Sequence, residues 1–258
     1  MVIGITGMNG FLGSAVATTS QQQGHKVVRI VLPRTREIRD EKYIRQFLAP
    51  LKVDAIIHTA VTRYPNTESE EYLNASFPAH LEKTFRLINE AGIFIHISSA
   101  NVLVRSLQDR YTKTKRSAEL HLTDSQAIII RPSLIWSWDG QGDAKRLEKY
   151  VGRLFSLMVY PGNIHLPVLI QDIAEKIVAL IKAKNKNKIF NIIGDTRCSI
   201  WELAKCFSNK HNGFLIPIPT LPDVGFLPKP LRTIDYTIFD YSMFQKPSKV
   251  ITLPFRFW

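Results

Sequence analysis

The first thirteen residues place three glycines directly after a short apolar run. Residues 2–5 are followed by Gly7, Gly10 and Gly13 in the spacing G-x-x-G-x-x-G, and a helix-like segment comes next. One glycine permits a tight strand-to-helix turn, and another lets the backbone approach a pyrophosphate without a Cβ in the way. The N–H groups at the start of the helix then favour the phosphates. This order predicts a dinucleotide-binding loop, although structural turns also use glycine.

The composition is that of a globular protein. Of the 258 residues, 45% are hydrophobic and 22% are charged, as in ordinary globular domains. There is no run of 18 apolar residues, so we expect no membrane span. The glycine-loop strand begins at residue 2, and a cleaved leader would remove it. Cys198 and Cys206 are too few for a disulfide framework, which predicts a cytoplasmic location.

The net charge indicates anionic partners. Lys and Arg number 34 against 22 Asp and Glu, which gives a formal charge of +12 and long-range attraction for phosphate-bearing cofactors or nucleotide-linked substrates. The densest basic stretch, residues 182–188, alternates lysine with Ala and Asn and is interpreted as a solvated loop. We therefore expect no nucleic-acid partner. Peripheral contact with an anionic membrane and a homodimer both stay open.

Strand-like and helix-like segments alternate through the first half. Strands are expected at 26–32, 53–58, 93–97 and 127–130, with helices at 14–23, 41–51, 78–91 and 110–122. This alternation predicts an α/β fold, a doubly wound parallel sheet of the Rossmann type with helices on both faces. Residues 1–132 are predicted to form the dinucleotide-binding domain.

The second half is less regular. Residues 133–258 are predicted to be mainly a smaller substrate-binding region, with about 165–195 returning to the Rossmann sheet. Within it, 140–158 is basic and helix-prone, 161–167 is loop-like, and 168–182 becomes a helix. Seven prolines and many aromatic residues follow from Phe214 onward, which predicts an irregular lid, although a surface wrap would look the same.

A tyrosine and a lysine four positions apart supply acid–base chemistry. Tyr111, Lys115 and Glu119 fall on one face of the helix expected at 110–122. Tyrosine has a pKa of about 10, so work near neutrality needs roughly 3–4 kcal/mol of stabilisation of its anion, which an ammonium can help supply. Ser98 and Ser99 follow a strand and lie at the carboxyl edge, where parallel sheets bind ligands. Such a hydroxyl can orient a substrate while the tyrosine exchanges the proton.

These motifs, in this order, resemble the extended short-chain dehydrogenase/reductase family of nucleotide-sugar epimerases, dehydratases and 4-keto-reductases. Further matches are the stretch D-A-I-I-H-T-A at 54–60, Asn74, Arg131-Pro132, Q-D-I-A at 171–174, and N-I-I-G at 191–194 with Ser199 and Glu202-Leu203. The resemblance runs from residue 2 to about 207. It implies an NAD(P)-dependent oxidoreductase of polysaccharide biosynthesis.

Carried over to this chain, the resemblance implies Tyr111 as general acid/base, Lys115 as its pKa partner and nicotinamide-ribose ligand, and Ser99 as the orienting hydroxyl. Ser98 is the alternative to Ser99. The implied cofactor site comprises Gly7, Asn9, Gly10, Phe11, Leu12, Gly13, Arg34, Arg36, Glu37, Ile38, Thr59, Ala60, Arg63, Asn74, Ile97, Tyr111, Lys115 and Pro132. The candidate substrate contacts are Ser98, Ser99, Asn101, Arg153 and Arg232. No metal is expected.

Three departures from the family pattern matter. One is an abbreviated segment at Glu37-Ile38, where the family has an acidic–apolar pair beside adenine. Val31 stands where many members have an acidic residue that binds the adenosine ribose. The guanidinium groups of Arg34 and Arg36 nearby can bind a 2′-phosphate through paired hydrogen bonds. This favours NADP(H) as cofactor, with NAD(H) open. Only 12 positions separate Ser99 from Tyr111, about half the usual gap, so the loop that normally carries substrate contacts is abbreviated.

The residues after the strand-end serines narrow the reaction. Ala100-Asn101 replace the Asp-Glu pair of the family's dehydratases, and no cysteine lies there to serve a combined epimerase–reductase. A reductase of a nucleotide-linked 4-keto-sugar is favoured, with a C4 epimerase as the alternative. A catalytically silent NADP-binding sensor or scaffold is the third reading. Lys145, Arg146, Arg153 and Arg232 are candidates for a substrate diphosphate.

Overall fold

The structure, a computed structural model, describes residues 1–31, 37–139, 141–151, 155–183, 188–219, 221–222, 232–233 and 244–245. The chain forms two compact units. The first comprises Met1–Pro132 and Gln171–Asn191, and the second comprises Ser133–Ile170 and Ile192–Trp258. None of the helices in the described part of the chain is both long enough and apolar enough to cross a membrane.

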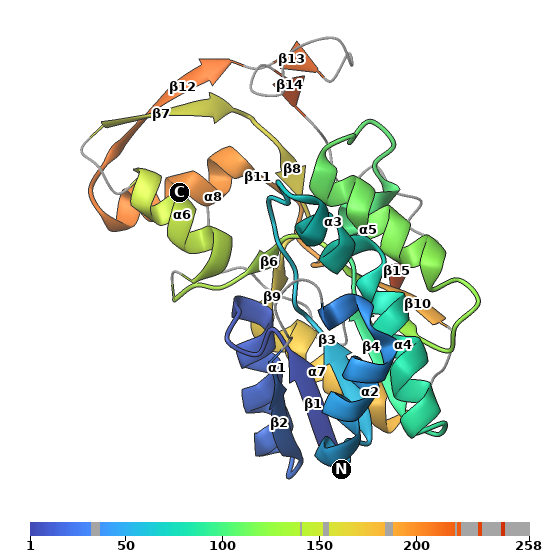
Figure 1. Cartoon of the computed structure of the whole chain (residues 1–258). Helices are drawn as coiled ribbons and strands as arrows, with labels where there is room; N and C mark the ends of the chain where they lie inside the picture. Colours follow the sequence, from blue (N-terminus) through green and yellow to red (C-terminus); the bar gives the residue numbers. More distant parts are fainter. Residues whose placement is uncertain are drawn as a thin grey trace. The chain divides into compact units, whose positions relative to one another are not determined.

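The first unit is built on a twisted sheet (Figure 1). The strands that this unit contributes to the sheet are β1 (Val2–Thr6), β2 (Lys26–Ile30), β3 (Ala55–His58), β4 (Ile93–Ile97), β5 (Ile128–Pro132) and β10 (Lys188–Ile192). They lie in the order β10-β5-β4-β3-β1-β2. The pairs β1–β2, β1–β3, β3–β4 and β4–β5 are parallel. Strand β2 lies on one side of β1, and β3, β4 and β5 follow on the other side. This reversal in the order of strands along the sheet confirms the predicted doubly wound, Rossmann-type fold.

Helices cover this sheet. They are α1 (Phe11–Gln22), α2 (Glu41–Leu48), α3 (Glu68–Ala75), α4 (Phe77–Ile88), α5 (Arg110–His121) and α7 (Ile170–Lys182), with short 3₁₀ turns η1 (Glu37–Arg39), η2 (Ala49–Leu51) and η3 (Ala100–Leu103). Every residue of β3 and β4 is buried, as expected for strands covered on both faces. A core cluster joins Ile56 of β3 and Phe94 of β4 to Leu48 of α2 and to Phe77 and Phe85 of α4.

The described part of the second unit consists of short strands and two helices. Its elements are β6 (Ile135–Trp136), α6 (Gly142–Val151), β7 (Phe155–Tyr160), β8 (Ile164–His165), β9 (Val168–Leu169), β11 (Cys198–Ser199), α8 (Ile200–Lys210), β12 (Phe214–Pro219), β13 (Leu221–Pro222), β14 (Arg232–Thr233) and β15 (Phe244–Gln245). β7 pairs with β12 in parallel. Trp136, Leu147, Leu203 and Phe207 form its core.

Two sequence-based expectations for the second unit are wrong. The helix expected through 140–158 ends at Val151, and strand β7 follows. Ser156 and Met158 are buried while Leu157 and Tyr160 are exposed, an alternation that suits a strand. The segment from Phe214, expected to be irregular, instead begins with β12, which pairs with β7.

Candidate active site

The loop between β1 and α1 has a geometry that requires glycine at two positions. Gly7 has a φ of 68°, and a Cβ there would lie 2.7 Å from the backbone nitrogen of Ala60. A Cβ on Gly13 would collide with the Gly7 carbonyl oxygen and lie 2.8 Å from Thr59 Oγ1. The Gly10 N–H donates to the Gly7 carbonyl at 2.8 Å and closes the turn. The backbone is therefore packed as a close-fitting cradle at the edge of the sheet.

The N-terminus of α1 is suited to an anion. Gly10 is the N-cap, it provides no side-chain cap, and the first turn carries no acidic residue. By contrast, Asp40, Thr67 and Asp109 cap α2, α3 and α5 through their side chains. No side-chain cap occupies the first backbone N–H groups of α1, so they can donate hydrogen bonds to a ligand. The helix dipole also favours a negative charge there. These residues fit the pyrophosphate of a dinucleotide.

The end of β2 lies beside the glycine loop. Ile30 pairs with Thr6, and the next residue, Val31, is 56% exposed. An uncharged side chain therefore stands at the predicted ribose position. Arg34 and Arg36 lie outside the described residues. Glu37 opens η1, and Ile38 is fully buried in the core, so Ile38 supports this segment from beneath.

The segment after β3 is held from two sides. Thr59 Oγ1 donates to the Thr6 carbonyl at 2.7 Å. Asn74 on α3 is buried and makes two hydrogen bonds to Thr62: its Oδ1 accepts from the backbone N–H at 2.9 Å, and its Nδ2 donates to the carbonyl at 2.7 Å. Asn74 thereby braces the stretch that contains Ala60 and Arg63.

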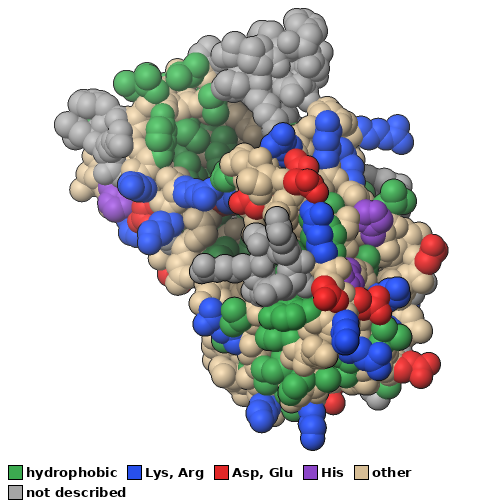
Figure 2. Space-filling view, in the orientation of Figure 1, with side chains coloured by type: hydrophobic (Ala, Val, Ile, Leu, Met, Phe, Trp, Pro, Cys, Tyr) green, Lys and Arg blue, Asp and Glu red, His purple; other side chains and the backbone are tan. Residues whose placement is uncertain are grey.

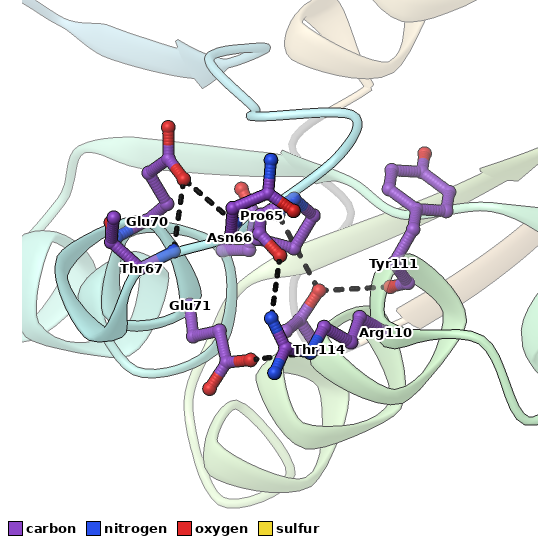
Figure 3. A network of polar contacts seen from close by, with 9 residues as sticks. Pro65, Asn66, Thr67, Glu70, Glu71, Arg110, Tyr111 and Thr114 are labelled. Carbon is purple, nitrogen blue, oxygen red and sulfur yellow. Dashed lines mark hydrogen bonds and ion pairs between the residues drawn. The ribbon is translucent and has the colours of Figure 1, made fainter.

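A polar network links the start of α3 to the start of α5 (Figure 3). Arg110 Nε forms an ion pair with Glu71 Oε1 at 3.4 Å, and Arg110 Nη1 donates a hydrogen bond to the Pro65 carbonyl at 3.4 Å. The next residue, Tyr111, directs its ring away from this network, and its carbonyl accepts from Thr114 Oγ1 at 2.8 Å. The network thus fixes the helical turn that carries the tyrosine.

Lys115 lies one turn further along α5 and is only 3% exposed. Its Nζ donates to the Ile97 carbonyl at 2.6 Å and lies 6.0 Å from the centroid of the Tyr111 ring. Burial lowers the pKa of Lys115 to about 8, against the opposing effect of Glu119. The amine still carries its proton at neutral pH, where a cation near the ring stabilises a phenolate.

Glu119 links three elements at this edge of the sheet. It forms an ion pair with Arg131 of β5 at 2.5 Å and accepts a hydrogen bond from Ser98 Oγ at 2.5 Å. Ser98 is buried and its hydroxyl serves Glu119. Ser99 is half-buried, and its Oγ accepts from the Asn101 N–H at 3.2 Å, which leaves its own proton for a substrate oxygen. The two predicted serines thus differ: Ser98 is bonded to Glu119, whereas Ser99 is half-buried and accepts a hydrogen bond from the backbone.

A histidine pair and an arginine near the site are missing from the sequence-based candidates. The rings of His58 and His96 stack with their centroids 5.6 Å apart. Burial lowers the pKa of His58 to about 3 and lowers the pKa of His96 well below its usual value. Both are therefore neutral. Arg116, next to Lys115, donates to three carbonyls of the abbreviated loop. The sequence feature that could have indicated Arg116 is its position directly after Lys115 of the Y-x-x-x-K motif.

The candidate diphosphate ligands belong to the second unit. Lys145 and Arg146 lie on α6, Arg153 lies outside the described residues, and only the backbone of Arg232 is described, in β14. Figure 2 shows Lys and Arg side chains dispersed over the visible face and not gathered into one patch. Of these four residues, only Lys145 and Arg146 have side chains that the structure describes, and both are exposed.

The doubly wound sheet and its glycine loop define a Rossmann-type protein, the fold expected of the extended short-chain dehydrogenase/reductase family. The chain belongs to the RmlD substrate binding domain family, whose model matches residues 1–220. Membership confirms the resemblance seen in the sequence and, with it, the expectation of an enzyme of this class.

Individual proteins are similar at lower identity. The spore coat polysaccharide biosynthesis protein SpsK of Bacillus subtilis (strain 168) is 21% identical over 217 residues, which span 78% of this chain and 76% of SpsK. A dTDP-4-dehydrorhamnose reductase from Clostridium acetobutylicum ATCC 824 superposes with a TM-score of 0.73 at 19% identity, covering 91% of this chain and 90% of that chain.

Two further structures were solved with cofactors. A dTDP-4-dehydrorhamnose reductase from Bacillus anthracis str. Ames in complex with NADP has a TM-score of 0.73 at 18% identity, covering 95% of this chain and 94% of that one. A UDP-glucose 4-epimerase from Thermus thermophilus in complex with NAD has a TM-score of 0.70 at 15% identity, covering 91% and 90%. These likenesses establish the shared fold.

Proposed function

We propose that this protein is an NADP(H)-dependent reductase of a nucleotide-linked 4-keto-sugar, with Ser99, Tyr111 and Lys115 as its catalytic residues. The observation that carries the proposal is the buried Lys115 ammonium, 6.0 Å from the Tyr111 ring. The names of similar proteins support the substrate class, because they include dTDP-4-dehydrorhamnose reductases and a polysaccharide biosynthesis protein.

The proposed roles follow from the chemistry of each group. The Ser99 hydroxyl donates a hydrogen bond to the substrate carbonyl oxygen and orients it. The Tyr111 hydroxyl gives its proton to that oxygen, and Lys115 stabilises the phenolate that remains. The bound nicotinamide cofactor supplies the hydride to the carbonyl carbon.

The cofactor proposal depends on two features of the first unit. The glycine cradle and the uncapped start of α1 suit the pyrophosphate. Val31 offers no carboxylate to the ribose diol, and the loss of such a charge-assisted hydrogen bond costs NAD(H) about 1.5–3 kcal/mol. We therefore propose NADP(H), with NAD(H) as the alternative.

The test measures binding and turnover separately. Purified protein is titrated with NADPH and NADH by nicotinamide fluorescence, and NADPH consumption is then followed on a panel of dTDP- and UDP-linked 4-keto-sugars. Tyr111→Phe, which retains the ring, is the matched variant. We expect tighter binding of NADPH and turnover that depends on the tyrosine hydroxyl.

Other outcomes would point to the alternatives. Interconversion of C4 epimers of a nucleotide sugar without net NADPH consumption would indicate an epimerase. Tight NADPH binding without turnover of any sugar would indicate a silent sensor or scaffold. Tighter binding of NADH than of NADPH would contradict the argument from Val31.

A further inference from the structure

The abbreviated loop between β4 and α5 is a chain of consecutive tight turns. The N–H groups of Val102, Val104 and Leu107 donate to the carbonyls of residues three positions earlier, at 3.2, 3.1 and 3.0 Å. The loop begins at Ser99 and ends at Asp109, the N-cap of α5. Its two ends therefore adjoin the proposed orienting hydroxyl and the proposed acid.

The carbonyls of this loop converge on one side chain. Arg116 Nε donates to the Val102 carbonyl at 3.0 Å, Nη1 to the Leu107 carbonyl at 2.8 Å, and Nη2 to the Val104 carbonyl at 2.6 Å. Each guanidinium nitrogen thus donates to a different carbonyl of the loop. Such charge-assisted bonds are stronger than neutral ones, and the planar fork of arginine fixes all three directions at once.

Apolar contacts and hydrogen bonds both hold this loop among the described residues. Within 101–108, Leu107 is the residue classed as buried, at 1% exposure, while the other side chains are half-buried or exposed. Val102, Leu103 and Val104 are half-buried and supply apolar packing, and the polar bonds to Arg116 fix the directions of the loop carbonyls in addition. Arg116 is also adjacent to Lys115, so the anchor and the proposed pKa partner share one turn of α5.

We propose that Arg116 is a positioning residue that holds residues 99–109 in one conformation and thereby sets Ser99 relative to Tyr111. Its effect on catalysis rests on the proposed function, whereas its effect on the loop does not. An abbreviated loop then supports a formed site, because its anchor holds it in one conformation.

The experiment compares Arg116→Ala and Arg116→Lys with Lys113→Ala, an exposed position on the same helix. Amide hydrogen exchange is measured at Val102, Val104 and Leu107. We expect exchange at these amides to speed up by about tenfold or more in Arg116→Ala, less in Arg116→Lys, and not in Lys113→Ala. Unchanged exchange in both Arg116 variants would overturn the proposal.

Kinetics with NADPH and a dTDP-linked 4-keto-sugar supply a readout beyond stability. We expect kcat of Arg116→Ala to fall by about 100-fold, the cost of misplacing a reacting group by about 1 Å, with NADPH affinity unchanged. Added guanidinium ion should restore part of kcat. A kcat equal to that of the wild type would overturn the positioning role.

The two proposals fail in different ways. A wild-type protein that reduces no nucleotide 4-keto-sugar contradicts the proposed function, and the exchange data then decide the role of Arg116 alone. If Arg116→Ala does not fold, Arg116→Lys keeps the charge but cannot reach three carbonyls from a single nitrogen. Its exchange and kcat then carry the test.

Discussion

The Lys115 ammonium donates a hydrogen bond to the Ile97 carbonyl at 2.6 Å, from a position that is 3% exposed. The carbonyl belongs to the last residue of β4, and the lysine belongs to α5. This bond ties the helix of the proposed acid to the strand end that carries the proposed orienting hydroxyl. It also keeps a buried charge satisfied next to Tyr111.

The buried lysine predicts how stability depends on pH. Burial lowers its pKa from 10.5 to about 8, so the folded protein releases this proton at lower pH than the unfolded chain. Between about pH 8 and 10.5 the unfolded state holds more protons, and the free energy of unfolding rises with pH. Below that range both states are protonated and the penalty, about 3 kcal/mol, is fully present.

Urea unfolding of the wild type and of Lys115→Met measures this contribution. The difference between the two proteins isolates the lysine, because every other titrating group is common to both. The wild type should gain stability relative to the variant from about pH 8 to pH 10. Parallel pH profiles would contradict a lowered pKa for Lys115.

The two serines after β4 should respond differently to substitution. Ser98→Ala removes a hydrogen bond to the charged Glu119 and should cost about 1.5–3 kcal/mol of stability with little change in kcat. Ser99→Ala should lower kcat by about 100-fold with little change in stability. Chemical denaturation and NADPH consumption on the same preparations separate the two effects. The opposite pattern would exchange the roles of the serines.

The glycine cradle predicts a loss of cofactor affinity in Gly13→Ala. The added methyl group would collide with the Gly7 carbonyl oxygen, and such overpacking typically costs about 1–3 kcal/mol. We expect weaker NADPH binding by fluorescence titration and a lower free energy of unfolding. Ser14→Ala, at the exposed next position, is the control and should bind NADPH like the wild type. Unimpaired binding by Gly13→Ala would contradict the cradle.

Val31 predicts a switch of cofactor preference. Val31→Asp adds a carboxylate after β2, next to the glycine loop. It should strengthen NADH binding by about tenfold, through a charge-assisted hydrogen bond to the ribose. It should weaken NADPH binding by repulsion of the 2′-phosphate. Val31→Asn, which lacks the charge, is the control. An unchanged ratio of affinities would place the ribose elsewhere.

Much of the first unit could be predicted from local sequence patterns. Short β-branched runs bounded by glycine or proline predict buried strands, and the glycine triplet predicts the loop that follows β1. The one-face spacing of Tyr111, Lys115 and Glu119 follows from helix geometry alone. Helix α3 was not predicted, although Thr67 and Glu70 form a capping box that signals its start.

The rest depends on contacts between distant residues. β7 and β12 pair across about sixty residues, and no local period indicates which strands meet. The prediction of a helix beyond Val151 was wrong because the basic and apolar residues there suit either a helix or a strand. The anchoring role of Arg116 depends on where three carbonyls of a folded loop point. The partners of Glu119 likewise become visible only when β4 and β5 lie side by side.

The most direct test of the account is the rate of NADPH consumption on a dTDP-linked 4-keto-sugar by the wild type and by Tyr111→Phe. The variant keeps the ring beside Lys115 and loses only the hydroxyl group whose proton is to be transferred. We predict turnover by the wild type and a fall in kcat of about 100- to 10,000-fold in the variant, with unchanged NADPH affinity. Equal rates for the two proteins would contradict the assignment of Tyr111 as the acid.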